Sequence, residues 1–326
     1  MHPSVKRIGI LTSGGDAPGM NAAIRAVVRT AHAYGVESVG IRRGYHGLIH
    51  NDLVSLSALD VSGITGLGGT ILYTARSAEF LEERGQQQAA EICRAHGIDA
   101  LVAIGGDGTF RGALDLSRQG IPVVGIPATI DNDIACTSYT IGYDTACNTA
   151  IQMTDKLHDT MMSHERCSVV EVMGHRSGYL ALYVGIAVGA TAILVPEREV
   201  DLEYDVLSRI RTGRARGRTH FMIIVAEGAA SAAVIGDAIV NSTGIDTRVS
   251  VLGHVQRGGS PNVRDRVTAS RMGYHAVRTL LAGHSNCIVC TQGDRCTDID
   301  IIAALQMKKG LDMDIYAISD VLISGA

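Results

Sequence analysis

The 326-residue sequence lacks several features that would assign it early to a class of protein. No apolar run approaches the roughly 20 residues that cross a bilayer, so a membrane partner is not expected. The formal charge is −4, from 29 basic and 33 acidic residues, so no overall positive field favours nucleic acid. No segment resembles a signal peptide, and seven cysteines, an odd number, indicate reduced thiols and a cytoplasmic protein.

Several nucleotide-binding motifs are absent as well. No Gly-Lys-Ser or Gly-Lys-Thr occurs, which excludes a P-loop, and no His-Arg-Asp or Asp-Phe-Gly suggests a protein kinase. Arg111 stands where the third glycine of a dinucleotide-binding turn belongs. The basic run 209–218 contains no aromatic residue for base stacking, so a phosphate-effector pocket or a solvated loop is the better interpretation.

Cys287, Cys290 and Cys296 superficially resemble a metal-binding knuckle. The segment 286–291 reads as a strand, however, and residues three apart on a strand point to opposite faces. Buried structural thiols are therefore favoured over a zinc site.

The sequence is rich in glycine. Glycine accounts for 38 of the 326 residues, more than its usual share of about 7%, and many of these glycines directly follow short apolar runs. Such runs alternate with helical patterns, which favours parallel sheets covered on both faces. We predict an α/β fold with two Rossmann-like, three-layer αβα domains and mainly parallel sheets. The expected strands are 7–12, 36–41, 100–104, 121–126, 167–173, 192–195, 221–225, 249–255 and 286–291, and the clearest helices are 24–34, 86–96, 144–162 and 265–281.

The sequence is organised around residues 104–133. One apolar run ends in a turn containing Gly105, Gly106 and Gly108, whose bare backbone suits phosphate, with Asp107 placed to hold Mg²⁺. The next run leads to Asp131 and Asp133. Phosphoryl transfer needs positive charge on the moving group and a base for the acceptor hydroxyl. Arg76 and Asp131 can supply these, which predicts a phosphotransferase. The glycine turn could instead be only a tight turn that binds no ligand. Residues Asp131–Asp133 could form an Asx turn or a calcium-like loop.

Five segments, in order, resemble bacterial 6-phosphofructokinases of the phosphofructokinase family. They are Leu11–Arg25, Gly105–Gly108, Pro127–Asp133, Val170–Gly174 and Leu252–Ser260. The resemblance fades after about Lys309. It implies Mg²⁺-dependent transfer of the γ-phosphate of ATP to the 1-hydroxyl of fructose 6-phosphate in a homotetramer.

The resemblance also implies roles for individual residues and domains. An ATP-binding domain would span 1–142 and about 256–305, and a sugar-binding domain 143–255 and about 306–326. The implied catalytic residues are Gly15, Arg76, Thr129, Asp131 and Asp133. The implied ATP-binding residues are Gly15, Arg76, Ser77, Gly106, Asp107, Gly108 and Thr109, with Asp107 at the metal. The implied substrate-binding residues are Thr129, Ile130, Asp131, Arg166, Met173, Gly174, His175, Glu227, Arg248, His254, Val255, Gln256 and Arg257. Arg166 and Arg248 would reach a neighbouring subunit's site. Considered without the resemblance, His254 would be interpreted as a buried structural histidine.

Two positions bear on the phosphoryl donor. Pyrophosphate-using relatives typically carry Asp in place of Gly108, which obstructs the nucleotide's α-phosphate. They also carry Lys in place of Ala128, which binds a pyrophosphate oxygen. Gly108 and Ala128 therefore indicate ATP.

Two departures from the bacterial pattern are expected to matter. Arginine usually follows Met-Gly, but here His175 comes first and Arg176 second, so we expect weakened phosphate binding or altered pH dependence. In the effector site, Arg25, Arg29, Arg216 and Arg218 match the family's basic residues, although Arg25 and Arg29 could equally form a solvated face. Ala58, His158 and Thr191 replace two arginines and a metal-binding glutamate, so weak or absent ADP activation and phosphoenolpyruvate inhibition are expected.

Other functions remain as alternatives. NAD and lipid kinases share the glycine turn but not the segment Thr129–Asp133. A non-catalytic regulatory or sugar-phosphate-binding homologue would explain the altered positions, but Asp107 and Asp131 are both present. A pyrophosphate-dependent variant is the third alternative.

Overall fold

The computed structural model describes residues 5–293 and 295–324, and the chain divides into two compact units. The first contains the chain up to Thr129, Ile134–Asp144 and Arg257–Lys309, and the second contains Ile130–Asp133, Thr145–Gln256 and the chain from Gly310 onward. The predicted boundaries put 130–133 with the first unit, whereas this segment groups with the second. Which substrate each unit binds stays a prediction.

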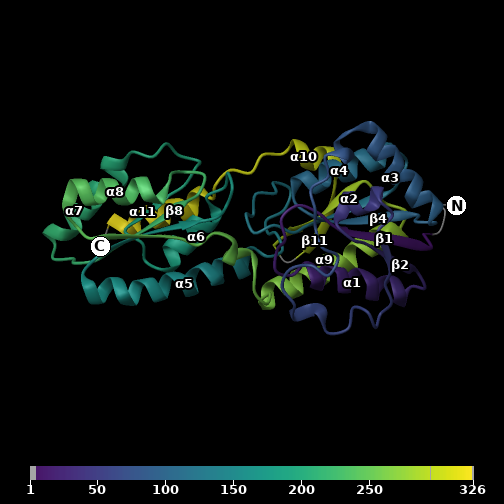
Figure 1. Ribbon diagram of the computed structural model, residues 1–326, viewed down its shortest axis with the longest axis horizontal. Helices are drawn as coiled ribbons and strands as arrows, with labels where there is room; N and C mark the ends of the chain where they lie inside the picture. The colour runs from purple at the N-terminus through teal and green to yellow at the C-terminus, as the bar shows by residue number, and fades with distance from the viewer. Residues whose placement is uncertain (1–4, 294, 325–326) are drawn as a thin grey trace. The chain divides into compact units, whose positions relative to one another are not determined.

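A seven-stranded sheet forms the centre of the first unit, in the order β11-β10-β5-β4-β1-β2-β3 (Figure 1). The strands from β10 to β2 run parallel, and β3 and β11 are antiparallel edges. The elements are β1 (Arg7–Thr12), α1 (Met20–Ala33), β2 (Glu37–Ile41), α2 (Gly44–Ile49), β3 (Leu53–Ser55), η1 (Ile64–Gly66), η2 (Glu79–Leu81), α3 (Glu83–Ala95), β4 (Ala100–Gly105), α4 (Asp107–Arg118), β5 (Val123–Pro127), α9 (Val263–Leu281), β10 (Cys287–Gln292), β11 (Arg295–Asp300) and α10 (Ile301–Gln306).

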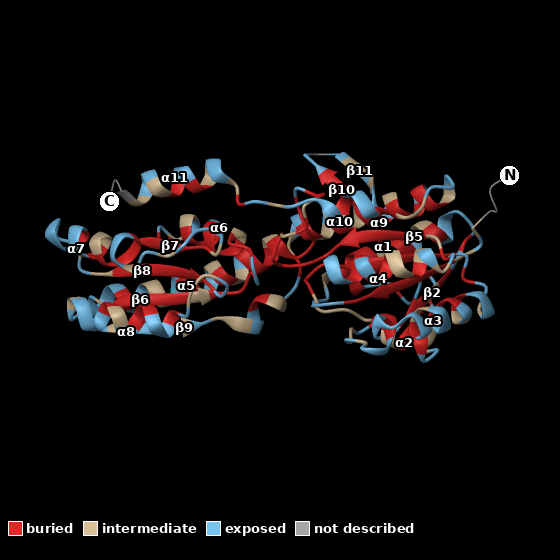
Figure 2. Cartoon of the chain, turned by 90° about the horizontal axis from the view of Figure 1, so that it is seen from above, coloured by how far each residue is buried: buried red, intermediate tan, exposed pale blue. Residues whose placement is uncertain are grey.

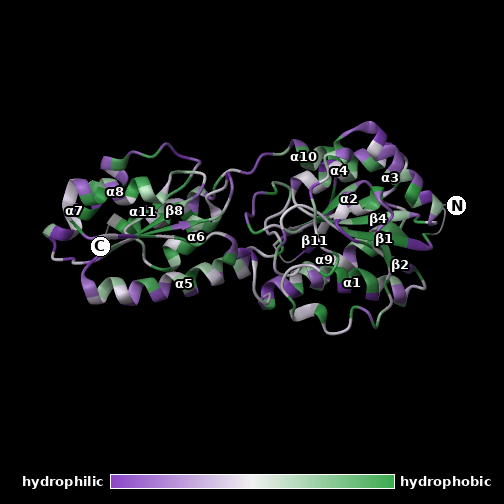
Figure 3. Cartoon of the chain, in the orientation of Figure 1, coloured by the Kyte–Doolittle hydropathy of each residue, from purple (hydrophilic) through white to green (hydrophobic). Residues whose placement is uncertain are grey.

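Helices cover both faces of this sheet. On one face α2, α3, α4 and α10 share a buried core, to which α4 contributes Phe110, Ala113 and Leu116 at helical spacing. On the other face α1 packs against α9, so closely that a Cβ on Gly273 would lie 2.6 Å from the Cβ of Ala26. Figure 2 shows buried residues concentrated along the strands, and Figure 3 shows the same strands as the most apolar part of the unit.

The second unit is built on a four-stranded parallel sheet in the order β7-β8-β6-β9. The helices α7 and α8 share a buried core with one face. The opposite face receives α6, whose Gly185 lies against Ile193, and α11 packs on α6. The elements are α5 (Tyr143–His164), β6 (Cys167–Val172), α6 (Tyr179–Ala187), β7 (Ala192–Leu194), η3 (Glu203–Leu207), α7 (Ser208–Ala215), β8 (Phe221–Ala226), α8 (Ala232–Thr243), β9 (Thr247–Val251), η4 (Gly253–Arg257) and α11 (Met313–Ser324).

The predicted fold class, α/β with mainly parallel sheets covered by helices on both sides, is confirmed. Individual elements differ from the expectations. The strand expected through Val255 ends at Val251, because Gly253 turns the backbone to φ 56° and a helical turn begins. A short helix, α2, also forms outside the expected helices, because Tyr45, Leu48 and Ile49 bury against the core.

All seven cysteines are buried or partly buried thiols outside disulfides. On β10, Cys290 joins the core beneath α4 and α10 while Cys287 does not, consistent with opposite faces of one strand. The thiol that hydrogen-bonds to Cys290 is that of Cys136, and this bond lowers the pKa of Cys136. Within the described residues, no helix is long and apolar enough to cross a membrane.

Candidate functional site

Three loops meet at the carboxyl edge of the first unit's sheet because β1, β4 and β5 are parallel neighbours. Backbone hydrogen bonds join them: Ser13 N donates to Ile104 O at 3.1 Å, and Ala128 N donates to Gly105 O at 2.9 Å. The buried Thr109 hydroxyl donates to Ser13 O at 2.9 Å. The structure thus brings the predicted glycine turn beside the loop after β1, with Thr109 tying the two together.

The glycines at this edge differ in whether the protein's own packing excludes a side chain. A Cβ on Gly105 would lie 2.3 Å from both Ser13 O and Thr109 Oγ1, so the protein's own packing excludes a side chain there. A Cβ on Gly108 would meet nothing within 4 Å, and one on Gly106 only Thr129 Cβ at 4.0 Å. Packing therefore does not require glycine at 106 or 108, and these two positions leave the space in front of the edge open.

Asp107 is the first residue of α4 and is exposed at this open edge. The backbone N–H groups that begin a helix attract anions, and the helix dipole adds to this attraction. A carboxylate beside bound phosphates is the kind of oxygen ligand that Mg²⁺ takes, since Mg²⁺ usually binds one or two carboxylates together with phosphate oxygens and water. Asp107 therefore fits the metal role that the sequence indicated.

The segment carrying Arg76 and Ser77 is attached to the same edge through β1. The Thr12 hydroxyl donates to Tyr73 O at 2.9 Å, and the Thr74 hydroxyl donates to Gly14 O at 2.7 Å. These bonds hold Arg76, which is exposed, next to the loop that follows β1.

Asn21 is a positioning residue that sequence reasoning missed. Its buried side chain donates to Leu67 O and Gly68 O, each at 3.1 Å, and accepts from Ile71 N at 2.8 Å. The available signal was an amide in an otherwise apolar helical face, which requires hydrogen-bond partners when buried.

Arg257, which the resemblance assigned to substrate binding, lies in the first unit. Its guanidinium lies over Gly15, where a Cβ would be 2.3 Å from Nη1, and it donates to Asp16 O at 3.2 Å. A side chain at position 15 would therefore compete with Arg257 for space. Gly15 and Arg257 therefore lie in contact, next to the carboxyl edge of the first unit's sheet.

The segment Thr129–Asp133 follows β5 closely. Thr129, Ile130, Asp131 and Asn132 are all buried, and Asp133 is half-buried. Asn132 has φ 49°, a conformation that asparagine tolerates better than most residues, so a tight turn separates the two aspartates. The Thr140 hydroxyl donates to Thr129 O at 2.7 Å and supports the start of this turn.

The carboxyl edge of the second unit's sheet carries another group of predicted residues. Met173 and Gly174 follow β6, and Glu227 follows β8. The Glu227 carboxylate accepts from His175 N at 2.8 Å, and a Cβ on Gly228 would lie 2.2 Å from His175 O. His175 has φ 54°, so its backbone is held in the left-handed region by the turn after β8.

Arg166 and Arg248 lie at the opposite, amino edge of the same sheet. Arg166 directly precedes β6, and Arg248 is the second residue of β9. Both bind Asp246, through Arg166 Nε at 2.6 Å and Arg248 Nη2 at 3.2 Å. At about 3.3 Å per residue, the six-residue strand β6 separates these arginines from Met173 by about 20 Å. They cannot contact a ligand that lies beside Met173 of the same chain.

His254, Val255 and Gln256 lie on η4, the turn after β9. His254 and Val255 are exposed, whereas Gln256 is fully buried and donates to Gly253 O at 3.1 Å. The structure therefore leaves His254 accessible to a ligand, and Gln256 shapes the turn.

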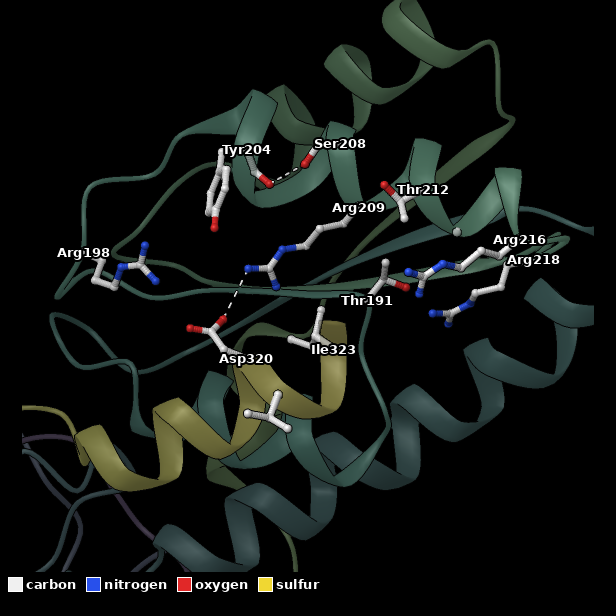
Figure 4. Close-up of a pocket in the computed structure, with 12 residues that line it drawn as sticks. Thr191, Arg198, Tyr204, Ser208, Arg209, Thr212, Arg216, Arg218, Asp320 and Ile323 are labelled. Atoms are coloured by element: carbon white, nitrogen blue, oxygen red, sulfur yellow. Dashed lines mark hydrogen bonds and ion pairs between the residues drawn. The ribbon is translucent and has the colours of Figure 1, made fainter. Parts of the chain in front are cut away.

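The candidate effector residues fall into two groups, one in each unit. Arg25 and Arg29 lie on α1, and Arg29 donates to the Ala58 carbonyl at 3.4 Å. Arg216 and Arg218, with Thr191, line a cavity of about 460 Å³ in the second unit (Figure 4).

Four arginines and one aspartate line this cavity, so it favours an anion. Sequence reasoning missed Arg198 and Asp320, the latter from α11, whereas Arg209 begins the basic run 209–218 that was interpreted as a phosphate-effector pocket or a solvated loop. Arg209 binds Asp320 at 3.3 Å, as Figure 4 shows. The Thr191 hydroxyl accepts a hydrogen bond from Met222 N at 3.2 Å, so this hydroxyl stabilises the sheet.

His158, which replaces an arginine in the resemblance, is not among the lining residues of this cavity. It lies edge-on against His220, with ring centroids 5.7 Å apart. Burial lowers the pKa of His220, and His158 and Arg218 lower it further.

Comparison with known proteins agrees with the resemblance in the sequence. A family model described as phosphofructokinase matches residues 7–280. The ATP-dependent 6-phosphofructokinase of Brevibacillus brevis is 50% identical over 318 residues, covering 98% of this chain and 99% of that protein. Phosphofructokinase from Saccharomyces cerevisiae superposes with a TM-score of 0.88 at 35% identity, over 98% of this chain and 48% of that one. A pyrophosphate-dependent phosphofructokinase from Marinobacter aquaeolei shares the fold, with a TM-score of 0.82 at 21% identity over 98% of this chain and 92% of that one. The chain belongs to the phosphofructokinase family.

Proposed function

We propose that the protein is an ATP-dependent 6-phosphofructokinase of glycolysis, which transfers the terminal phosphate of ATP to the 1-hydroxyl of fructose 6-phosphate. The products are ADP and fructose 1,6-bisphosphate. The observation that carries this proposal is the open edge at Gly106–Gly108, with Asp107 beginning α4 and Asp131 following two residues beyond Thr129. The relatives named ATP-dependent 6-phosphofructokinase, about half identical over nearly the whole chain, support it.

ATP phosphates bind the backbone of the open edge, where N–H groups at the start of α4 point outward. Arg76 and Ser77 contact the phosphates from the neighbouring segment, and Gly15 leaves room for Arg257 beside them. Asp107 would hold Mg²⁺, which would supply positive charge near the transferring phosphate. The metal itself is proposed from the fit of this exposed carboxylate.

Asp131 accepts the proton of the 1-hydroxyl as the phosphate is transferred. A carboxylate within hydrogen-bond reach of the acceptor hydroxyl is what this chemistry requires of a base. Asp131 is buried, so bulk water does not compete for its oxygens. Thr129 and Asp133 support it, and the positive φ of Asn132 fixes the turn on which the base sits.

The sugar phosphate binds Met173, Glu227 and His254 of one subunit. Arg166 and Arg248 contribute from a neighbouring subunit of a homotetramer, which is consistent with their place at the far edge of their own sheet. Sedimentation equilibrium of the purified chain tests the assembly, and a stable monomer with full activity would contradict it. The cytoplasmic location stays a prediction, supported by seven cysteines that lie outside disulfides.

A coupled assay tests the reaction directly. Fructose 6-phosphate with ATP and Mg²⁺ is expected to give fructose 1,6-bisphosphate, whereas pyrophosphate or no donor should give none. Turnover with pyrophosphate alone would establish the pyrophosphate-dependent alternative. Binding of fructose 6-phosphate without turnover would favour the regulatory homologue.

His175→Arg is expected to lower the KM for fructose 6-phosphate by about 10-fold and to flatten its dependence on pH between 6 and 9. A charged hydrogen bond to phosphate contributes about 1.5–3 kcal/mol, and histidine changes charge in this range while arginine does not. The backbone at φ 54° accepts either side chain at similar cost. The matched control is His164→Arg on α5, which is exposed and outside the candidate site. Unchanged kinetics across this pH range would refute a role for residue 175.

Hyperbolic kinetics with fructose 6-phosphate are expected, with little response to ADP or phosphoenolpyruvate. Thr191 offers no carboxylate for a metal, Ala58 offers no cation, and Arg209 is already bound to Asp320 in the cavity. Initial rates over a range of fructose 6-phosphate concentrations, with and without each effector, check this. Sigmoidal curves that ADP converts to hyperbolic ones would show that the remaining arginines suffice for regulation.

A further inference from the structure

A cluster of two histidines and one glutamate lies in the first unit, outside the residues assigned above. His46 and His50 are four apart on α2, so they share one face of the helix. Glu79 begins η2. One ligand atom from each of the three side chains lies within 4.8 Å of the other two. Two histidines at this spacing with one carboxylate form a known zinc-binding pattern.

The hydrogen bonding of His50 presents a lone pair to the cluster. Its Nδ1 lies 2.8 Å from the His46 carbonyl oxygen, and because a carbonyl only accepts, Nδ1 carries the proton. Nε2 is then the ring nitrogen left to bind a metal ion. A backbone carbonyl that fixes the second ring nitrogen is the usual outer support of a metal-bound histidine.

The spacing of the ligand atoms suits one shared ion. His50 Nε2 lies 3.6 Å from Glu79 Oε2, which is too long for a hydrogen bond. Two ligands of a tetrahedral zinc, each at about 2.0–2.1 Å, lie about 3.4 Å apart. The His46 and His50 rings lie against each other, with centroids 4.3 Å apart and ring planes tilted by 37°.

We propose that His46, His50 and Glu79 bind a divalent transition-metal ion of the zinc class, with water completing the coordination. Imidazole ligands favour zinc, copper or nickel over Mg²⁺, so this site is chemically distinct from the carboxylate Asp107. His50 and Glu79 are exposed, so an ion can enter directly from solvent.

The ion would join α2 to η2, two segments that are already in contact. Tyr45 on α2 stacks on Phe80 of η2 with ring centroids 4.2 Å apart, and the Tyr45 hydroxyl donates to Thr109 O. The Phe80 N–H donates to Ser77 Oγ at 3.3 Å. Metal binding is therefore expected to stiffen the segment that carries Arg76 and Ser77. Binding itself does not depend on phosphoryl transfer and is tested without substrates.

Titration calorimetry with Zn²⁺ tests the proposal, on reduced full-length protein without nucleotide and in a buffer that does not chelate. One ion per chain is expected. His46→Gln, His50→Gln and Glu79→Gln should each weaken binding by more than the roughly 10–100-fold that loss of an outer-shell partner costs. His32→Gln and Glu91→Gln, at exposed positions on α1 and α3, should leave binding unchanged. Zn²⁺ should raise the Tm of the wild type but not that of the three ligand variants.

The Co²⁺-loaded protein separates this site from the seven cysteines. Ligation by nitrogen and oxygen gives no sulfur-to-cobalt charge-transfer band, whereas thiolate ligation does. A thiolate band, absence of binding, or Zn²⁺ binding that persists in all three ligand variants would overturn the proposal.

Discussion

Asp131→Asn is expected to lower kcat by about 10²- to 10⁴-fold, the contribution of a general base, and to change the KM values for ATP and fructose 6-phosphate much less. The amide has nearly the same size and keeps the turn set by Asn132, but it cannot accept the hydroxyl proton. Steady-state rates of the coupled assay at saturating substrates measure the effect.

The matched control is Asp115→Asn on α4, where the carboxylate binds Arg118 at 3.3 Å away from the edge. Its kcat should stay within a factor of about two, because removing an exposed ion pair costs at most about 1 kcal/mol of stability. Unfolding curves of both variants show whether the folded fraction is equal. If Asp131→Asn keeps more than a tenth of the wild-type kcat, another group must accept the proton.

Gly108→Asp is expected to lower kcat/KM for ATP by about 10³-fold while leaving the fold intact. A Cβ at this position meets no protein atom within 4 Å, so the carboxylate would project into the open space that we propose for the phosphates of ATP. Two like unit charges about 4 Å apart repel by about 4 kcal/mol at an effective dielectric constant of 20, which corresponds to roughly 10³ in affinity. Initial rates at varied ATP concentrations give this ratio.

Gly108→Ala separates charge from size. Alanine within an unobstructed helix is expected to stabilise the protein by about 0.4–1 kcal/mol, with a much smaller loss of kcat/KM. Gly105→Ala should instead destabilise strongly, because its Cβ would overlap Ser13 O. Equal losses of kcat/KM in the Gly108→Ala and Gly108→Asp variants would argue against charge repulsion. Ala128→Lys, at the second position that bears on the phosphoryl donor, is a less specific test because Ala128 is fully buried and lysine would also disturb packing.

The strand pattern and the position of the glycine turn could be predicted because both depend on neighbouring residues. Ala100–Ile104 reads as a buried strand, the spacing of Phe110, Ala113 and Leu116 reads as a helix, and the turn between them must lie at the sheet edge. Once β4 and β5 are parallel neighbours, Asp107 and Thr129 follow at the same edge. Local periodicity and chain connectivity are sufficient for these conclusions.

Contacts between distant residues could not be predicted in the same way. Asp265 at the start of α9 accepts from Tyr139 and Gly142, and Arg166 shares Asp246 with Arg248. The sequence around either partner does not indicate these pairs. Each pair depends on the lengths and positions of the helices and strands that lie between the two residues.

The sequence by itself determined the α/β class and the place of the glycine turn after a strand, and it predicted phosphate binding there with Asp107 and Asp131 as the chemical groups. Only the tertiary structure decided that Gly105 serves packing while Gly108 leaves open space, and that Arg257 lies over Gly15. It also decided that His46, His50 and Glu79 form one cluster. The physical reason is that side-chain direction and the space in front of a residue are set by atoms far away in the chain, which local patterns do not encode.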